Sequence, residues 1–340
     1  MKGRVIALGQ IAGREAAALM EDGRLQDLLV APEDTGPMPG AIYRAKVGRP
    51  MKGQGGAILD TPDGPLFLRQ AKGLRPGQGL IVQVVSKAEG HKAAPATPRV
   101  LIKSRYVIGT PGAPGVNISR DIRDDEVRLA LREATADIDL PNGTGLILRS
   151  AAAESVDAML DDLESVLPVL AGISAETNEG EPSLLLEAPS PADLAWRDWP
   201  QPDLMDDGAR AFDDYGVWDA LEDLRAPAVR LSSGGAMSVE ATRALVAVDV
   251  DTGGDTSPAA GLKANMAALK ELPRQLRLRG LGGQIVVDLA PFNKKERKPL
   301  ESVLRTALKA DPIETTIVGW SALGLMELQR KRERPALGDF

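Results

Sequence analysis

Ala247-Val248-Asp249-Val250-Asp251-Thr252-Gly253-Gly254 is the stretch that decides the fold. An apolar run that ends in Asp-x-Asp and then glycine is typical of a β-strand finishing at the carboxyl edge of an α/β sheet. Because side chains alternate along a strand, Asp249 and Asp251 are expected on one face. A second apolar run, residues 285–287, is also followed by an aspartate, Asp288. The pattern predicts two adjacent strands that end in carboxylates.

Carboxylates at the ends of adjacent strands suit Mg²⁺, which binds one or two carboxylates together with water and phosphate oxygens. The helix expected at 262–279 would carry Lys270, Arg274 and Arg277 on one basic stripe, suited to a phosphate backbone. Further positive charge follows Asp288, at Lys294, Lys295, Arg297 and Lys298. Single strand-end aspartates usually cap helices or turns, but this combination favours metal-assisted phosphodiester hydrolysis.

The composition excludes several other chemistries. The 340 residues contain no cysteine and one histidine, His91, so disulfides, zinc clusters and cysteine nucleophiles are excluded. With 43% hydrophobic residues the chain can fill two or three domain cores. No apolar run approaches the roughly 18 residues of a membrane span. The N-terminus carries Arg14 and Glu15 where a signal peptide would be apolar, so a cytoplasmic protein without membrane contact is expected.

The formal charge of −7 conceals strong segregation along the chain. Residues 39–110 carry 12 Lys or Arg against 3 Asp or Glu, and residues 261–340 carry 15 against 9. Residues 151–230 carry 4 against 19. Two basic blocks separated by an acidic one are typical of a protein that binds a polyanion, although charge runs can also be solvated faces.

Short β runs with glycine turns follow Gly40 and predict a small barrel, and its basic charge favours an oligonucleotide-binding one. Outside the barrel, the pattern predicts strands at 4–8, 28–30, 145–148, 244–250, 284–289 and 315–318. Besides 262–279, helices are expected at 14–20, 124–136, 155–171, 299–309 and 323–332.

The run 240–300 resembles the catalytic core of the ribonuclease E/G family. In that family a strand reading Ala-Ile-Asp-Val-Asn-Ser-Gly precedes a helix ending Arg-Gln-Leu-Arg-Leu-Arg-x-Leu-Gly-Gly, and then a strand reading Ile-Val-Ile-Asp-Phe. Residues 274–279 and 281–283 match the helix end almost letter for letter. Shorter matches extend the resemblance over most of the chain, at 118–120, 145–152, 231–235 and 323–330.

The resemblance implies an endoribonuclease that cleaves single-stranded RNA with Mg²⁺, or Mn²⁺ in its place, and without zinc. Asp249 and Asp288 match the family's magnesium ligands, which activate water and leave a 5′-phosphate on the downstream fragment. Asp251 stands where the family has an asparagine that orients the site, so the expected catalytic residues are Asp249, Asp251 and Asp288. Arg149 and Ser150 match an Arg-Thr pair that grips a 5′-monophosphate end. RNA-binding residues are expected at Phe67, Lys87, Lys92, Lys270, Arg274 and Arg277.

The resemblance also implies an α/β multidomain fold: an oligonucleotide-binding β-barrel inserted after an N-terminal segment, an α/β 5′-end-sensing domain and a C-terminal DNase I-like α/β catalytic domain. The expected segments are a ribonuclease-H-like one at 1–38, the barrel at 39–108, the 5′-sensor at 109–173, an acidic, shortened ribonuclease-H-like region or connector at 174–228, and the catalytic domain at 229–340.

The sequence departs from the family pattern in several places. Asp251 adds a negative charge that could alter metal binding, and Ile58 replaces a second aromatic residue of the barrel. The acidic region is much shorter than its counterpart, and the sequence ends at Phe340, before the family's Cys-Pro-x-Cys zinc link. A homodimer or a monomer, not a zinc-linked tetramer, is therefore expected.

Two other functions stay open at this point. The chain could be an RNA-binding protein of the same family without efficient turnover. It could also be a metal-dependent phosphodiesterase that acts on DNA or on a small nucleotide.

Overall fold

The computed structural model describes residues 2–33, 36–51, 55–88 and 92–339. The chain divides into two compact units, one made of Met1–Pro32 with Pro200–Phe340 and the other of Glu33–Trp199. His91, the single histidine, lies outside the described residues. No helix in the described part of the chain is long and apolar enough to cross a membrane.

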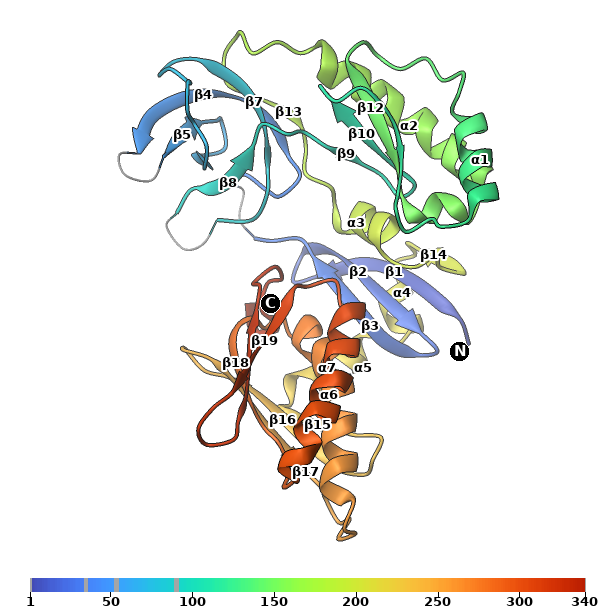
Figure 1. The fold of residues 1–340 in the computed structure, drawn as a ribbon, viewed down its shortest axis with the longest axis vertical. Helices are drawn as coiled ribbons and strands as arrows, with labels where there is room; N and C mark the ends of the chain where they lie inside the picture. The colour runs from blue at the N-terminus through green and yellow to red at the C-terminus, as the bar shows by residue number, and fades with distance from the viewer. Residues whose placement is uncertain (1, 34–35, 52–54, 89–91, 340) are drawn as a thin grey trace. The chain divides into compact units, whose positions relative to one another are not determined.

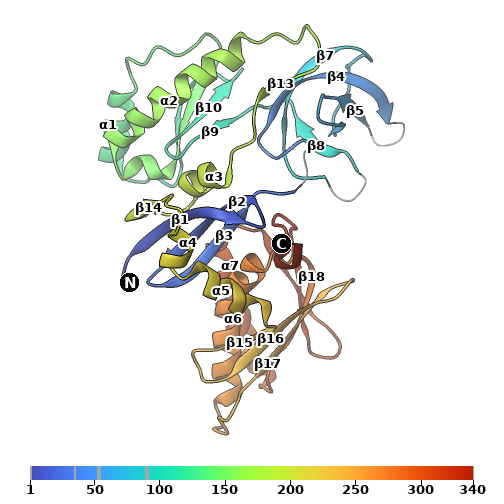
Figure 2. The same ribbon diagram turned by 180° about the vertical axis from the view of Figure 1, so that it is seen from behind.

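The unit Glu33–Trp199 contains a closed five-stranded barrel, visible in Figure 2. The barrel closes because the first strand pairs with the second and also with the fourth along the chain. Its strands are β4 (Ile42–Met51), β5 (Gly56–Asp60), β6 (Leu66–Leu68), β7 (Gly79–Val84) and β8 (Ala94–Thr97). Alternate residues such as Tyr43, Leu59 and Val82 fill the interior. The barrel is consistent with the predicted oligonucleotide-binding fold.

The rest of this unit is an α/β layer. Its four-stranded sheet has the order β11-β12-β10-β9, and the two longer helices pack their apolar faces onto it. The strands are β9 (Ile102–Lys103), β10 (Val107–Pro111), β11 (Gly115–Ile118) and β12 (Thr144–Leu148); the helices are α1 (Asp125–Ala134), α2 (Val156–Ala175) and α3 (Pro191–Asp198), with a 3₁₀ turn at Ser150–Ala153. Strand β13 (Ser183–Leu186) leaves this layer and extends the barrel sheet at β4.

The unit Met1–Pro32 with Pro200–Phe340 begins with a four-stranded sheet of order β14-β1-β2-β3. The strands are β1 (Arg4–Ile11), β2 (Arg14–Glu21), β3 (Arg24–Val30) and β14 (Leu204–Asp206), and the short helices α4 (Ala211–Asp214) and α5 (Val217–Arg225) follow. The predicted helix at 14–20 is wrong, because this alanine-rich run pairs on both sides and strand pairing overrides its helix propensity. The Asp-Gly pair at 22–23 is typical of a two-residue β-hairpin turn, and both residues have positive φ here, 51° and 76°. This pair indicates in the sequence that residues 14–21 form a strand.

A six-stranded sheet of order β15-β16-β17-β18-β20-β19 completes this unit. Helices α6 (Ala260–Leu278) and α7 (Arg297–Ala310) cover one of its faces (Figure 1). The strands are β15 (Ala228–Arg230), β16 (Ala236–Ala241), β17 (Val246–Asp251), β18 (Gly283–Asp288), β19 (Thr315–Trp320) and β20 (Met326–Arg330). The predicted helix at 323–332 is wrong, since β20 lies between β18 and β19 and alternates buried with more exposed residues.

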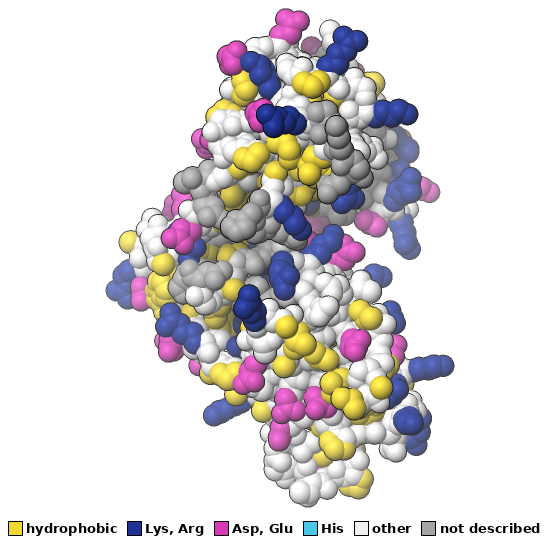
Figure 3. Space-filling view, turned by 90° about the vertical axis from the view of Figure 1, so that its left-hand side faces the viewer, with side chains coloured by type: hydrophobic (Ala, Val, Ile, Leu, Met, Phe, Trp, Pro, Cys, Tyr) yellow, Lys and Arg dark blue, Asp and Glu magenta, His cyan; other side chains and the backbone are white. Residues whose placement is uncertain are grey.

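The fold is therefore α/β with a small barrel, whereas the five-segment division stays a prediction. Residues 174–228 contribute to both compact units, through β13 in one and β14 in the other. On the face that Figure 3 shows, the segregation of charge along the chain does not give a region of one sign. Figure 3 shows Lys and Arg interspersed with Asp and Glu over the viewed face.

Candidate active site

Asp249 and Asp288, hereafter the aspartate pair, are direct neighbours in the six-stranded sheet. Strands β17 and β18 run parallel, and their register sets Asp249 opposite Asp288. The alternating residues Val248, Val250 and Val287 are buried against the helices, so both carboxylates emerge on the other, open face. The structure thus brings together the two predicted metal ligands.

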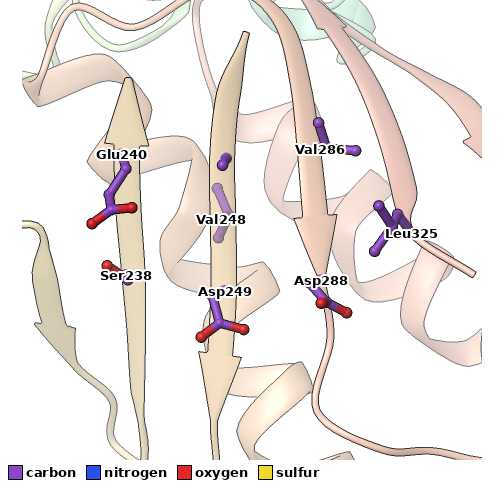
Figure 4. Close-up of a pocket in the computed structure, with 8 residues that line it drawn as sticks. Ser238, Glu240, Val248, Asp249, Val286, Asp288 and Leu325 are labelled. Carbon is purple, nitrogen blue, oxygen red and sulfur yellow. The ribbon is translucent and has the colours of Figure 1, made fainter. Parts of the chain in front are cut away.

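The aspartate pair lies in a shallow hollow of about 330 Å³ on this open face (Figure 4). Ser238 on β16 is the cross-strand neighbour of Asp249, so a hydroxyl and two carboxylates form one row across three strands. The hollow is lined by Ser238, Glu240, Ala247, Val248, Asp249, Val286, Asp288 and Leu325. Sequence reasoning missed Ser238 and Glu240, because the pairing of β16 with β17 has no local signal.

The segment that follows Asp288 is fixed by the first turns of α6. Asn265 is fully buried; its side-chain amide donates to the carbonyl of Ala290 at 2.8 Å and accepts from the Ala290 N–H at 2.9 Å. Gly261 approaches so closely that a β-carbon there would stand 2.2 Å from the carbonyl oxygen of Pro291. These contacts define the backbone direction where β18 ends and so help to orient Asp288.

Asp251 shares the exposed face of β17 but does not line the hollow. Its carboxylate accepts a hydrogen bond from the Gly253 N–H and closes the turn after the strand. An asparagine at this position could accept the same bond through its carbonyl oxygen. The structure thus gives Asp251 a turn-forming role, and its predicted catalytic role stays a prediction.

The donor set at the hollow fits one kind of metal. No group of three His, Cys, Asp or Glu that could hold a metal by itself occurs among the residues described. Two exposed carboxylates without soft ligands suit Mg²⁺, because this ion is usually bound by one or two carboxylates, with water and substrate phosphate oxygens as its other ligands.

The basic stripe predicted on α6 is not a phosphate-binding surface in this structure. Arg274 donates to the carbonyl of Leu25 at 2.7 Å, and Arg277 donates to the carbonyl of Gln26 at 2.7 Å. Both side chains are nearly buried where α6 packs on β3, and only Lys270 of the three is exposed. The prediction of RNA contacts at Arg274 and Arg277 is corrected, because these charges hold the two sheets of the unit together.

The other predicted contacts lie in the unit Glu33–Trp199. Arg149 donates to the carbonyl of Ser104 at 2.5 Å and pairs with Asp198 at 3.2 Å, while Ser150 is exposed at the start of the adjacent 3₁₀ turn. Asp198 also pairs with Arg197 at 2.6 Å. Burial raises the pKa of Asp198, but the hydrogen bonds and charges of Arg197 and Arg149 outweigh it and hold that pKa below its usual value.

The remaining predicted RNA contacts belong to the barrel. Phe67 is half-buried on β6, opposite Ile58 on β5, and its ring covers Gly56. Lys87 and Lys92 are exposed in the connection between β7 and β8.

Comparison with known proteins defines the class to which this fold and site belong. A model of the Ribonuclease E/G family matches residues 101–206 and 201–333, so the chain belongs to this family. It is 31% identical over 307 residues to ribonuclease E of Escherichia coli, covering 78% of this chain and 29% of that protein. It is 30% identical to ribonuclease E of Haemophilus influenzae, of which it spans 32%. With ribonuclease G of Escherichia coli, the identity is 27% over 94% of this chain and 78% of that protein.

Proposed function

We propose that this chain is an endoribonuclease of RNA processing that cleaves single-stranded RNA at the aspartate pair. The observation that carries the proposal is the register of β17 and β18, which sets two exposed carboxylates side by side in a chain of the ribonuclease E/G family. The chain spans about a third of the ribonucleases E, so their activity is carried over here as a proposal.

Asp249 and Asp288 are the residues that would hold Mg²⁺ or Mn²⁺. Such an ion would activate a water molecule and neutralise charge on the scissile phosphate, so that products carry a 5′-phosphate. The carboxylates act from fixed strand ends, and Ser238 presents a hydroxyl in the same row. The apolar side chains of Val286 and Leu325 border the carboxylates.

The barrel is the part of the chain that we assign to single-strand binding. Phe67 offers an aromatic ring for base stacking, and Lys87 and Lys92 offer charge along the backbone path. Ile58, opposite Phe67, cannot supply a second aromatic face, so base stacking rests on one ring.

A labelled single-stranded RNA incubated with Mg²⁺ or with EDTA tests the proposal. Endonucleolytic products with 5′-phosphate ends should form with Mg²⁺ and disappear in EDTA, because the proposed mechanism needs a metal ion at the aspartate pair to activate water. A single-stranded DNA of the same sequence is the control. Binding of RNA without cleavage would favour the RNA-binding alternative, and equal cleavage of DNA would favour a general phosphodiesterase.

Preference for a 5′-monophosphate end is a separate proposal that rests on Arg149 and Ser150. A phosphate would have to displace Asp198, which now pairs with the guanidinium of Arg149. Asp198→Asn should therefore raise the ratio of the cleavage rate of 5′-monophosphate RNA to that of 5′-hydroxyl RNA by roughly three- to tenfold. This factor corresponds to the free energy of one partly exposed ion pair.

Arg149→Leu should bring the same ratio to about one, with thermal unfolding measured to confirm folding. If the parent and both variants cleave the two RNAs at equal rates, end sensing is wrong for this chain. The predicted homodimer or monomer, and the cytoplasmic location, stay predictions.

A further inference from the structure

Arg297, the first residue of α7, forms a cation–aromatic pair with Trp320. Its guanidinium carbon lies 4.7 Å from the ring centroid of Trp320. The Trp320 ring is itself fixed, because its indole N–H donates to Glu301 at 2.7 Å and its centroid lies 5.5 Å from that of Phe292. The planar guanidinium is therefore held over a rigid surface, which lowers the entropy cost of binding a ligand.

The guanidinium of Arg297 has an aromatic partner but no carboxylate partner in the described part of the chain. Its guanidinium takes part in no ion pair among the described residues, whereas Arg305 on the same helix pairs with Glu301. Other ordered arginines of this unit, such as Arg277 and Arg330, pair with Asp311. An ordered guanidinium without a carboxylate partner is available to an external anion.

Arg297 lies beside the turn that precedes Leu325, one of the residues that line the hollow. Its Nη2 atom would lie 3.8 Å from a β-carbon built on Gly324, and the next residue, Leu325, lines the hollow with Asp288. Exposed lysines surround it on the same segment, at Lys294, Lys295 and Lys298. The acidic residues of this segment are already engaged, since Glu296 accepts from the Asn293 N–H and Glu301 accepts from Trp320.

We propose that Arg297, oriented by Trp320, binds a phosphodiester of the RNA strand on the Asp288 side of the hollow. The inference rests on the proposed function and adds a substrate contact to it. A guanidinium presents two N–H groups to one phosphate, and the neighbouring lysines add attraction that depends on salt. The contact reads the backbone and not the bases, so it applies to any single-stranded sequence.

The test measures RNA binding in an Asp249→Asn background, in which the bound strand stays intact. A labelled single-stranded RNA is titrated at several salt concentrations, with Arg297→Gln and Arg297→Lys as added changes. Arg305→Gln is the matched control, because Arg305 lies on the same helix and its charge is exposed and paired with Glu301. Thermal unfolding of each protein confirms that the fold is retained.

Arg297→Gln should weaken binding about tenfold and reduce the salt slope by roughly 0.7, as expected for one lost phosphate contact. Arg297→Lys should keep the slope and weaken binding by about threefold, since the charge remains without the planar fork. Arg305→Gln should change neither quantity. Equal affinities and slopes for Arg297→Gln and Arg305→Gln would overturn the inference, whereas failure of the proposed function would appear separately as absent metal-dependent cleavage by the parent.

Discussion

Asp249→Asn and Asp288→Asn are each expected to lower the cleavage rate by about 10³-fold, or several kcal/mol of transition-state stabilisation. Asparagine keeps the shape of the side chain and removes the charge that would hold a divalent cation. Both residues are exposed on the open face, so the fold and the affinity for RNA should change little. Single-turnover cleavage over a range of Mg²⁺ concentrations measures the loss.

The same chemical change far from the hollow is the control. Asp223→Asn alters an exposed carboxylate on α5, and it should cleave at the parent rate. A cleavage rate equal to the parent's in either Asp249→Asn or Asp288→Asn contradicts the assignment of the metal site. Loss of RNA binding in both would point instead to a role of the pair in substrate affinity.

Asp311→Ala should lower the free energy of unfolding of its unit by about 3–5 kcal/mol, because it leaves buried charges without a partner. The side chains of Asp311 and Arg330 are 1% and 0% exposed and lie 2.9 Å apart. Asp311 also pairs with Arg277, so one carboxylate compensates two guanidinium groups. Urea unfolding followed by circular dichroism measures the change.

Glu314→Ala is the matched control for Asp311→Ala, because the Glu314–Lys331 pair lies at the surface in the same region. Its unfolding transition should coincide with that of the parent, since water and salt screen exposed pairs. An Asp311→Ala protein that also unfolds with the parent would show that the buried cluster does not stabilise the unit.

The aspartate pair was predictable because its signals are local. An apolar strand ending in Asp249, another ending in Asp288 and a helix between them define a parallel crossover, and parallel neighbours end at the same edge. The barrel was predictable for the same reason, from short β runs between glycine turns. The alanine-rich strand β2 was not, because its pairing with β1 and β3 overrides its propensity.

The remaining site residues depend on contacts between distant parts of the sequence. Nothing near Arg274 indicates that the carbonyl of Leu25 accepts its hydrogen bond, and nothing near Ser238 indicates that it faces Asp249. The sequence around Asn265 likewise gives no sign that its side chain bonds to the backbone of Ala290. Long-range pairing, and not residue type, determines which charges are structural and which remain available to substrate.

Helix α6 joins two regions that are far apart in the sequence. Its first turns hold the backbone behind Asp288, and its last turns bind the carbonyls of Leu25 and Gln26 in β3. The helix is about 28 Å long, and Pro273 inside it lacks the backbone N–H that would complete one helix hydrogen bond. Strand β3 and the backbone after Asp288 are thus held by the same helix, so a change that loosens β3 removes part of the support of the segment that orients Asp288.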